Sequence, residues 1–95
     1  RADALSNQLL GELAGSLAAY DGARRTESLV ETQLLPQSQL SLRSALAAYE
    51  SGKVDFATLL DAQRQIRKAQ VDRLRARVEA HVRLAEIERI LGEEL

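Results

Sequence analysis

The hydrophobic positions in the first half of the chain follow a helical spacing. Large apolar side chains recur mainly every three or four residues in two runs, Leu10, Leu13, Leu17 and Tyr20, followed by Leu35, Leu42, Leu46 and Tyr49. Side chains at this spacing lie on one stripe of an α-helix. The sequence therefore predicts a helical first arm over about residues 2–50, with the stripe interrupted at residues 21–26.

Pro36 is the internal helix breaker of this arm. Its ring removes one backbone hydrogen bond and crowds the carbonyl of Thr32. Two outcomes stay open. The apolar stripe continues from Leu35 to Leu42 across the proline, which favours a kink within one long helix. A full break near residues 32–36 would instead divide the arm into two helices.

The second half predicts one long helix, from about Phe56 to Leu91 and closed by Gly92. Its expected inner stripe is Phe56, Leu59, Gln63, Ile66 and Gln70, continued one residue out of frame by Val71, Leu74, Val78, His81 and Ala85. The 18 residues from Phe56 to Leu74 make five turns of 3.6 residues. We therefore expect a nearly straight helix with little supercoiling.

A short turn separates the two arms. Gly52 is suited to the left-handed conformation that ends a helix, and Asp55 is suited to cap the start of the next helix. The fold class is therefore all-α, a long antiparallel helical hairpin of coiled-coil character. Residues 1–95 form one unit, with arm one over about 2–50, the tip over 50–55 and arm two over about 55–92.

Two contacts follow from this arrangement. Tyr49 and Phe56 flank the reversal, and we expect their rings to close the end of the hairpin. If residues whose numbers sum to about 105 face each other, acidic side chains of the first arm lie near basic ones of the second. The expected ion pairs are Glu31 with Arg73 and Glu27 with Arg77.

Composition supports a helical protein and excludes several functions. Ala, Leu, Glu, Lys and Arg supply 54 of the 95 residues, and the chain has no cysteine and a net charge of −1. The basic side chains share no single face, so we expect no nucleic-acid partner. His81 is the one histidine and is expected at the helix seam, so we expect no catalytic residues, metal or cofactor. The chain begins without methionine, and we expect it to be a segment of a larger protein.

The sequence around the turn resembles the tip of the second helical hairpin in TolC-type outer-membrane efflux proteins. Residues 45–64 share with that pattern Ala45, Tyr49, Gly52, Val54, Phe56, Leu59, Leu60, Asp61, Ala62, Gln63 and Arg64. The segment Leu34-Leu35-Pro36-Gln37 is similar to one common in the heavy-metal-efflux branch. The stretch from Ile87 to Gly92 is similar to the apolar helix end of the family.

The resemblance implies a function without chemistry. The parent protein would be a homotrimeric outer-membrane channel, and this hairpin would form part of the wall of its periplasmic tunnel. The tip would dock a periplasmic adaptor joined to an inner-membrane pump, through Tyr49, Ser51, Gly52, Lys53, Val54 and Asp55. We also expect the hairpin alone to self-associate. The alternative is a structural coiled coil, or the hairpin of a periplasmic adaptor of the membrane-fusion type.

Overall fold

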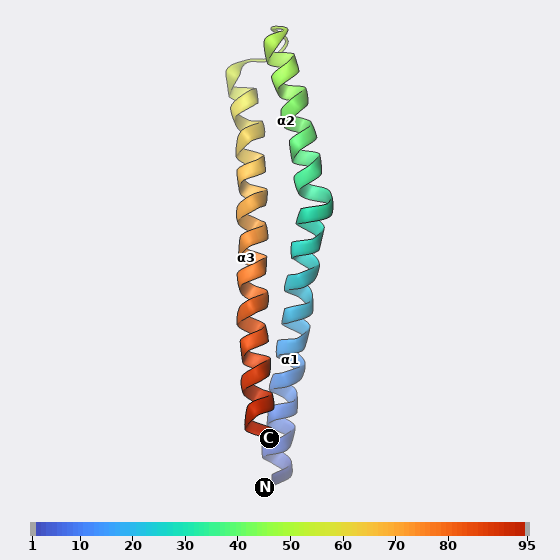
Figure 1. Cartoon of the computed structure of the whole chain (residues 1–95), viewed down its shortest axis with the longest axis vertical. Coiled ribbons are helices and arrows are strands. Elements are labelled where there is room, and N and C mark those ends of the chain that lie inside the picture. Colours follow the sequence, from blue (N-terminus) through green and yellow to red (C-terminus); the bar gives the residue numbers. More distant parts are fainter. Residues whose placement is uncertain (1, 95) are drawn as a thin grey trace.

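The computed structural model describes residues 2–94, with side chains over residues 3–93. The chain forms α1 (Ala2–Leu29), a π-helical turn η1 (Val30–Leu34), α2 (Leu35–Glu50) and α3 (Phe56–Glu94). The first three run end to end as one arm, and α3 returns beside them as the second arm (Figure 1). The molecule measures 72 × 17 × 16 Å. The predicted all-α antiparallel hairpin is confirmed, although α3 continues through Gly92 to Glu94 instead of closing at the glycine.

The two arms meet along a seam with a seven-residue repeat. In α3, buried or half-buried positions alternate by three and four residues, at Leu59, Ala62, Ile66, Ala69, Arg73, Ala76, Ala80, Arg83, Ile87 and Ile90. In the first arm the corresponding positions are Leu9, Leu13, Ser16, Tyr20, Ala23 and Glu27 of α1 and Val30 of η1. This spacing is that of a left-handed coiled coil. The predicted 3.6-residue period of the inner stripe is therefore wrong.

Alanine supplies five of the ten buried apolar residues among those described, and this corrects the predicted stripes. Ala69 is 1% exposed and Ala80 is 4% exposed, whereas Leu74 is 58% exposed. The residues predicted inside but found exposed are Leu10, Leu17, Leu46, Tyr49, Phe56, Gln63, Gln70, Val71, Leu74, Val78, His81 and Ala85. Small side chains let two helix axes approach closely, so the larger side chains are placed outside.

The predicted interruption at residues 21–26 is also wrong. Ala23 is 8% exposed and Glu27 is 6% exposed, and both continue the seam between Tyr20 and Val30. An alanine and a carboxylate at these positions carry little hydrophobic signal, so the sequence pattern concealed a continuous contact.

The first arm changes its helical geometry just before Pro36 without breaking. The backbone N–H of Leu35 donates to the carbonyl of Val30, five residues back, and Leu34 and Leu35 keep right-handed helical angles. A π turn holds one residue more than an α turn, and such turns bend helices. Of the two outcomes considered at Pro36, the structure shows a bend within a continuous arm, which bows outward beside α3 (Figure 1).

Candidate docking site at the hairpin tip

The end of α2 is fixed by backbone hydrogen bonds. Gly52 has a φ of 75°, the left-handed value expected for it. Its N–H donates to the carbonyl of Tyr49 over 3.0 Å, and the N–H of Lys53 donates to that of Ala48 over 2.8 Å. This pair of bonds is the Schellman motif, which satisfies the last carbonyls of a helix. The reversal is therefore a defined structure.

The start of α3 is fixed by Asp55. Its Oδ1 accepts hydrogen bonds from the backbone N–H of Thr58 at 3.0 Å and from the Thr58 hydroxyl at 2.9 Å. The backbone bond is the main cause that lowers the pKa of Asp55, with the hydroxyl next. Asp55 is thus the N-cap that the sequence predicts, and it is ionised at neutral pH.

Tyr49 and Phe56 meet across the turn, but they do not close its end. Their ring centroids are 6.0 Å apart with the planes at 65°, an edge-to-face contact. Tyr49 remains 41% exposed and Phe56 59% exposed. The expectation that these rings plug the hairpin is therefore wrong, because Leu59 and the alanines beyond it already close the seam. The rings form an aromatic pair on the outside of the tip.

The other tip residues are also accessible. Ser51, Gly52, Lys53 and Asp55 are exposed, and Val54 is half-buried. A Cβ placed on Gly52 would have no atom within 4 Å. The structure thus brings all six predicted site residues together on one rigid turn, and an adjacent aromatic residue, Phe56, joins them. A protein partner could contact the apolar area of the aromatic rings and the positive charge of Lys53 on this turn.

Ion pairs connect the two arms farther down. Nε of Arg77 lies 2.8 Å from Oε2 of Glu27, the predicted pair, and Nη2 of Arg77 lies 3.3 Å from Oε1 of Glu31. Glu31 is therefore paired with Arg77 and not, as predicted, with Arg73. Nη1 of Arg24 completes the group, 3.0 Å from Oε1 of Glu27. The hydrogen bond from Arg77 is the main cause that lowers the pKa of Glu27.

A second polar contact crosses the seam near the open end. The hydroxyl of Ser16, which is 7% exposed, donates to Oε2 of Glu86 over 3.1 Å. Arg83 lies 3.1 Å from the same oxygen, and its hydrogen bond, followed by that of Ser16, lowers the pKa of Glu86. Nearby, Nη2 of Arg89 lies 3.8 Å from Oε2 of Glu12 on the first arm. These cross-arm contacts are specific to one alignment of the arms.

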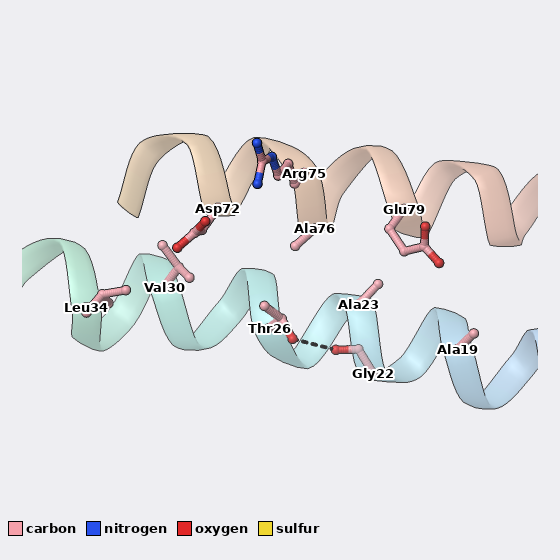
Figure 2. A pocket seen from close by; sticks show the side chains of 10 residues that line it. All are labelled: Ala19, Gly22, Ala23, Thr26, Val30, Leu34, Asp72, Arg75, Ala76 and Glu79. Carbon is pink, nitrogen blue, oxygen red and sulfur yellow. Dashed lines mark hydrogen bonds between the residues drawn. The ribbon is translucent and has the colours of Figure 1, made fainter. Parts of the chain in front are cut away.

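One side of the hairpin carries an open groove that the sequence analysis missed. Its volume is about 670 Å³, and Figure 2 shows small side chains of α1 along one wall and longer polar side chains of α3 along the other. The α1 wall includes Ala19, Gly22, Ala23 and Thr26, whose hydroxyl is bonded to the Gly22 carbonyl over 3.0 Å. A Cβ on Gly22 would meet nothing within 4 Å. The four-three-four spacing of Gly15, Ala19, Gly22 and Thr26 was the available signal for this face.

The outer face of α3 carries three apolar residues that the sequence analysis placed inside, Val71, Leu74 and Val78, together with Val82. Val71, Leu74, Val78 and Val82 are 40%, 58%, 53% and 48% exposed. Their spacing of three or four residues places them on one stripe of the helix, away from the α1 seam. The predicted stripe thus exists, but it faces outward.

Over residues 2–94, no helix is long and apolar enough to cross a bilayer. The same residues hold no group of three or more His, Cys, Asp or Glu side chains placed to bind a metal ion. Comparisons with protein-family models, with curated proteins and with solved structures found no match for this chain.

Proposed function

We propose that this hairpin is part of the periplasmic wall of a TolC-type outer-membrane efflux channel, and that its tip docks the periplasmic adaptor of a tripartite pump. The observation that carries the proposal is the tip itself. A rigid reversal displays Lys53 and the Tyr49–Phe56 ring pair to solvent, within a sequence that resembles the tip of that family.

The tip geometry supports docking over a purely local turn. The edge-to-face contact stabilises the turn but leaves both aromatic rings exposed, and aromatic residues are enriched at protein interfaces. The turn is also fixed by bonds at both helix ends, so little conformational entropy is lost when a partner binds. Gly52 has open space around its Cα and allows another backbone to approach closely.

The sides of the hairpin support assembly into a wall. The stripe of Val71, Leu74, Val78 and Val82 and the small-residue groove of α1 lie uncovered in the single chain. Faces of this kind are typical of helices that have further helical neighbours. In the proposed homotrimer, neighbouring helices would cover them.

The proposed role is a passive one. The hairpin would form wall and docking surface, while the inner-membrane pump would supply the energy for export. The segment Leu34-Leu35-Pro36-Gln37, at the π turn, suggests heavy-metal ions as the exported cargo by its similarity to that branch of the family.

Substitutions at the tip test the proposal in cells that depend on the complete channel for resistance. Gly52→Asp and Lys53→Glu should abolish resistance while outer-membrane trimer levels stay normal, because a new charge blocks close approach and reverses a rim charge. Lys68→Glu is the matched control, since it makes the same change at an exposed position of α3 away from the tip. Full resistance in both tip variants would exclude docking at this turn.

The sequence that flanks the hairpin in its gene separates this proposal from the alternative. An outer-membrane channel should continue into amphipathic strands of about 10 residues. A periplasmic adaptor should instead have the two halves of a lipoyl domain on either side of the hairpin, and a coiled-coil scaffold should have further heptads.

A further inference from the structure

The first arm contains two heptad frames that do not agree. The seam positions Ser16 and Ala23 of α1 and Val30, which directly follows α1, are seven residues apart. Extended by another α-helical turn, this frame would bring Leu34 and then Gln37 into the seam. The structure instead buries Leu35 and Ser38, one position later.

The frame of α2 is equally incompatible with α1. Leu35 and Leu42 define it, seven residues apart and buried or half-buried. Extended backwards from Leu35 in steps of seven, this frame would bring Ser28 and Asp21 into the seam. Extended in the same way from Ser38, it would bring in Glu31 and Arg24. Each half therefore buries its own apolar residues only if one residue is inserted between the two frames.

The π turn supplies that residue. Apart from Ala19, which lies beside Tyr20 and lines the groove, the buried and half-buried positions of the first arm step by three or four residues. The exception is the step from Val30 to Leu35, which is five. This interval coincides with η1, and the four residues between Val30 and Leu35 are all exposed. Val30 and Leu35 then pack together with Ala69 of α3 on the far side of the seam.

Both frames are anchored to α3 by contacts that depend on register. Below the π turn, Glu27 is bonded to Arg77 at 2.8 Å and Ser16 to Glu86 at 3.1 Å. On the tip side of the π turn, α2 is joined to α3 by a short connection. Hydrogen bonds of the Schellman turn and the Asp55 cap fix both ends of that connection. A seam of alanines alone would select register weakly, whereas buried polar partners select it strongly.

We propose that the π turn at Val30–Leu34 is a register compensator: it joins two heptad frames one residue apart, set by the tip above and by the Glu27–Arg77 contact below. Without it, α1 would have to rotate by about 100° to follow α2. That rotation would carry Glu27 away from the seam and turn Leu10 and Leu17 towards it. The compensator thereby determines which face of α1, the small-residue face, forms the lateral groove.

Pro36 offers a competing cause for the π turn, because proline disrupts the α-helical bonding of the preceding turn. The two causes make opposite predictions for Pro36→Ala. If the proline alone creates the π turn, alanine restores an α-helix and the register below it changes. If the two frames create it, the register is retained.

Disulfide formation measures the register, since the chain has no cysteine of its own. Ala23→Cys with Ala80→Cys joins two buried positions of the seam between α1 and α3. Their residue numbers sum to 103, between the sums of 102 for Ser16 with Glu86 and 104 for Glu27 with Arg77, so we expect them to face each other. The pair should cross-link efficiently in the parent chain and equally well when Pro36→Ala is added. In that background, deletion of Gln33 removes the inserted residue, so the frames become continuous. It should keep the cross-link and raise the thermal midpoint.

Deletion of Arg25 in the same background is the matched control. It also removes one exposed residue, but within α1. It would bring Glu12, Gly15 and Gly22 into the seam, so both the cross-link and the thermal midpoint should fall. The proposal is overturned if Pro36→Ala loses the cross-link, if deletion of Gln33 destabilises the hairpin as much as deletion of Arg25, or if the parent pair does not cross-link.

Discussion

Arg77 binds Glu27 across the seam, with Nε and Oε2 2.8 Å apart between residues 50 positions apart in the sequence. The partners differ in burial, because the Glu27 side chain is 8% exposed and that of Arg77 is 47% exposed. A buried ion pair adds little net stability, but removal of one partner leaves the other uncompensated. The asymmetry in burial therefore predicts an asymmetry between the two substitutions.

Arg77→Ala should destabilise the hairpin more than Glu27→Ala does. The first leaves a carboxylate in the seam with Arg24 as its remaining partner, whereas the second places an alanine in a seam of alanines and leaves Arg77 bonded to Glu31. Adding Glu27→Ala to Arg77→Ala should restore part of the lost stability. Urea midpoints of the four chains measure this, and Arg25→Ala, at an exposed pair with Asp21, should change stability by at most about 0.5 kcal/mol. Additive effects would contradict the pairing.

Stability should fall in acid. Hydrogen bonds lower the native pKa values of Glu27, Glu86 and Asp55 below their ordinary values of 4.5, 4.5 and 3.8. The unfolded chain then binds more protons than the native chain at low pH, so these groups stabilise the fold fully above about pH 5. That contribution is lost as the pH falls through the lowered native values.

Urea unfolding between pH 7 and pH 2 measures this loss. Three cationic or ionisable groups surround Glu27, namely Arg24, Arg77 and His81. Glu27→Gln removes the titrating carboxyl and should flatten the acid slope. An unchanged slope in Glu27→Gln would show that Glu27 titrates alike in both states.

Two glycines should respond in opposite ways to alanine. Gly22 lies within α1 with open space at its Cβ position, so Gly22→Ala should stabilise the single hairpin by about 0.5–1 kcal/mol. Gly52 has a φ of 75°, so Gly52→Ala should destabilise it by about 1–2 kcal/mol. Thermal midpoints of the two variants should therefore shift in opposite directions. A stabilising Gly52→Ala would contradict the left-handed turn.

The conformation of the tip could be predicted from the sequence, whereas the residues of the seam could not. The reversal depends on local residue chemistry, and Gly52 and Asp55 have the conformation and the hydrogen bond predicted for them. The seam depends on which residues meet a distant partner. Ala69 and Glu27 give no hydrophobic signal, while Leu74 and Val78 give a strong one and lie outside. Along the middle of α3, therefore, the large side chains lie on the uncovered face and the alanines lie in the contact between the arms.

The uncovered faces should make the hairpin self-associate. Leu74→Gln together with Val78→Gln should reduce association measured by sedimentation velocity and leave the helical content unchanged, because both residues lie outside the seam. Ala69→Leu is the complementary variant. It enlarges a side chain that is 1% exposed and should cost about 1–3 kcal/mol in stability by overpacking. A stable monomer at high micromolar concentration would contradict the expected association.

Docking at the tip is the central claim, and photo-cross-linking from the tip in living cells tests it most directly. A photoreactive amino acid at position 53, in place of the exposed Lys53, should capture a periplasmic adaptor subunit, identified by mass spectrometry. The same amino acid at position 68 in α3 should not. An adaptor product that depends on the tip position would support the proposed function. Absence of that product at position 53, or equal yield at position 68, would contradict it.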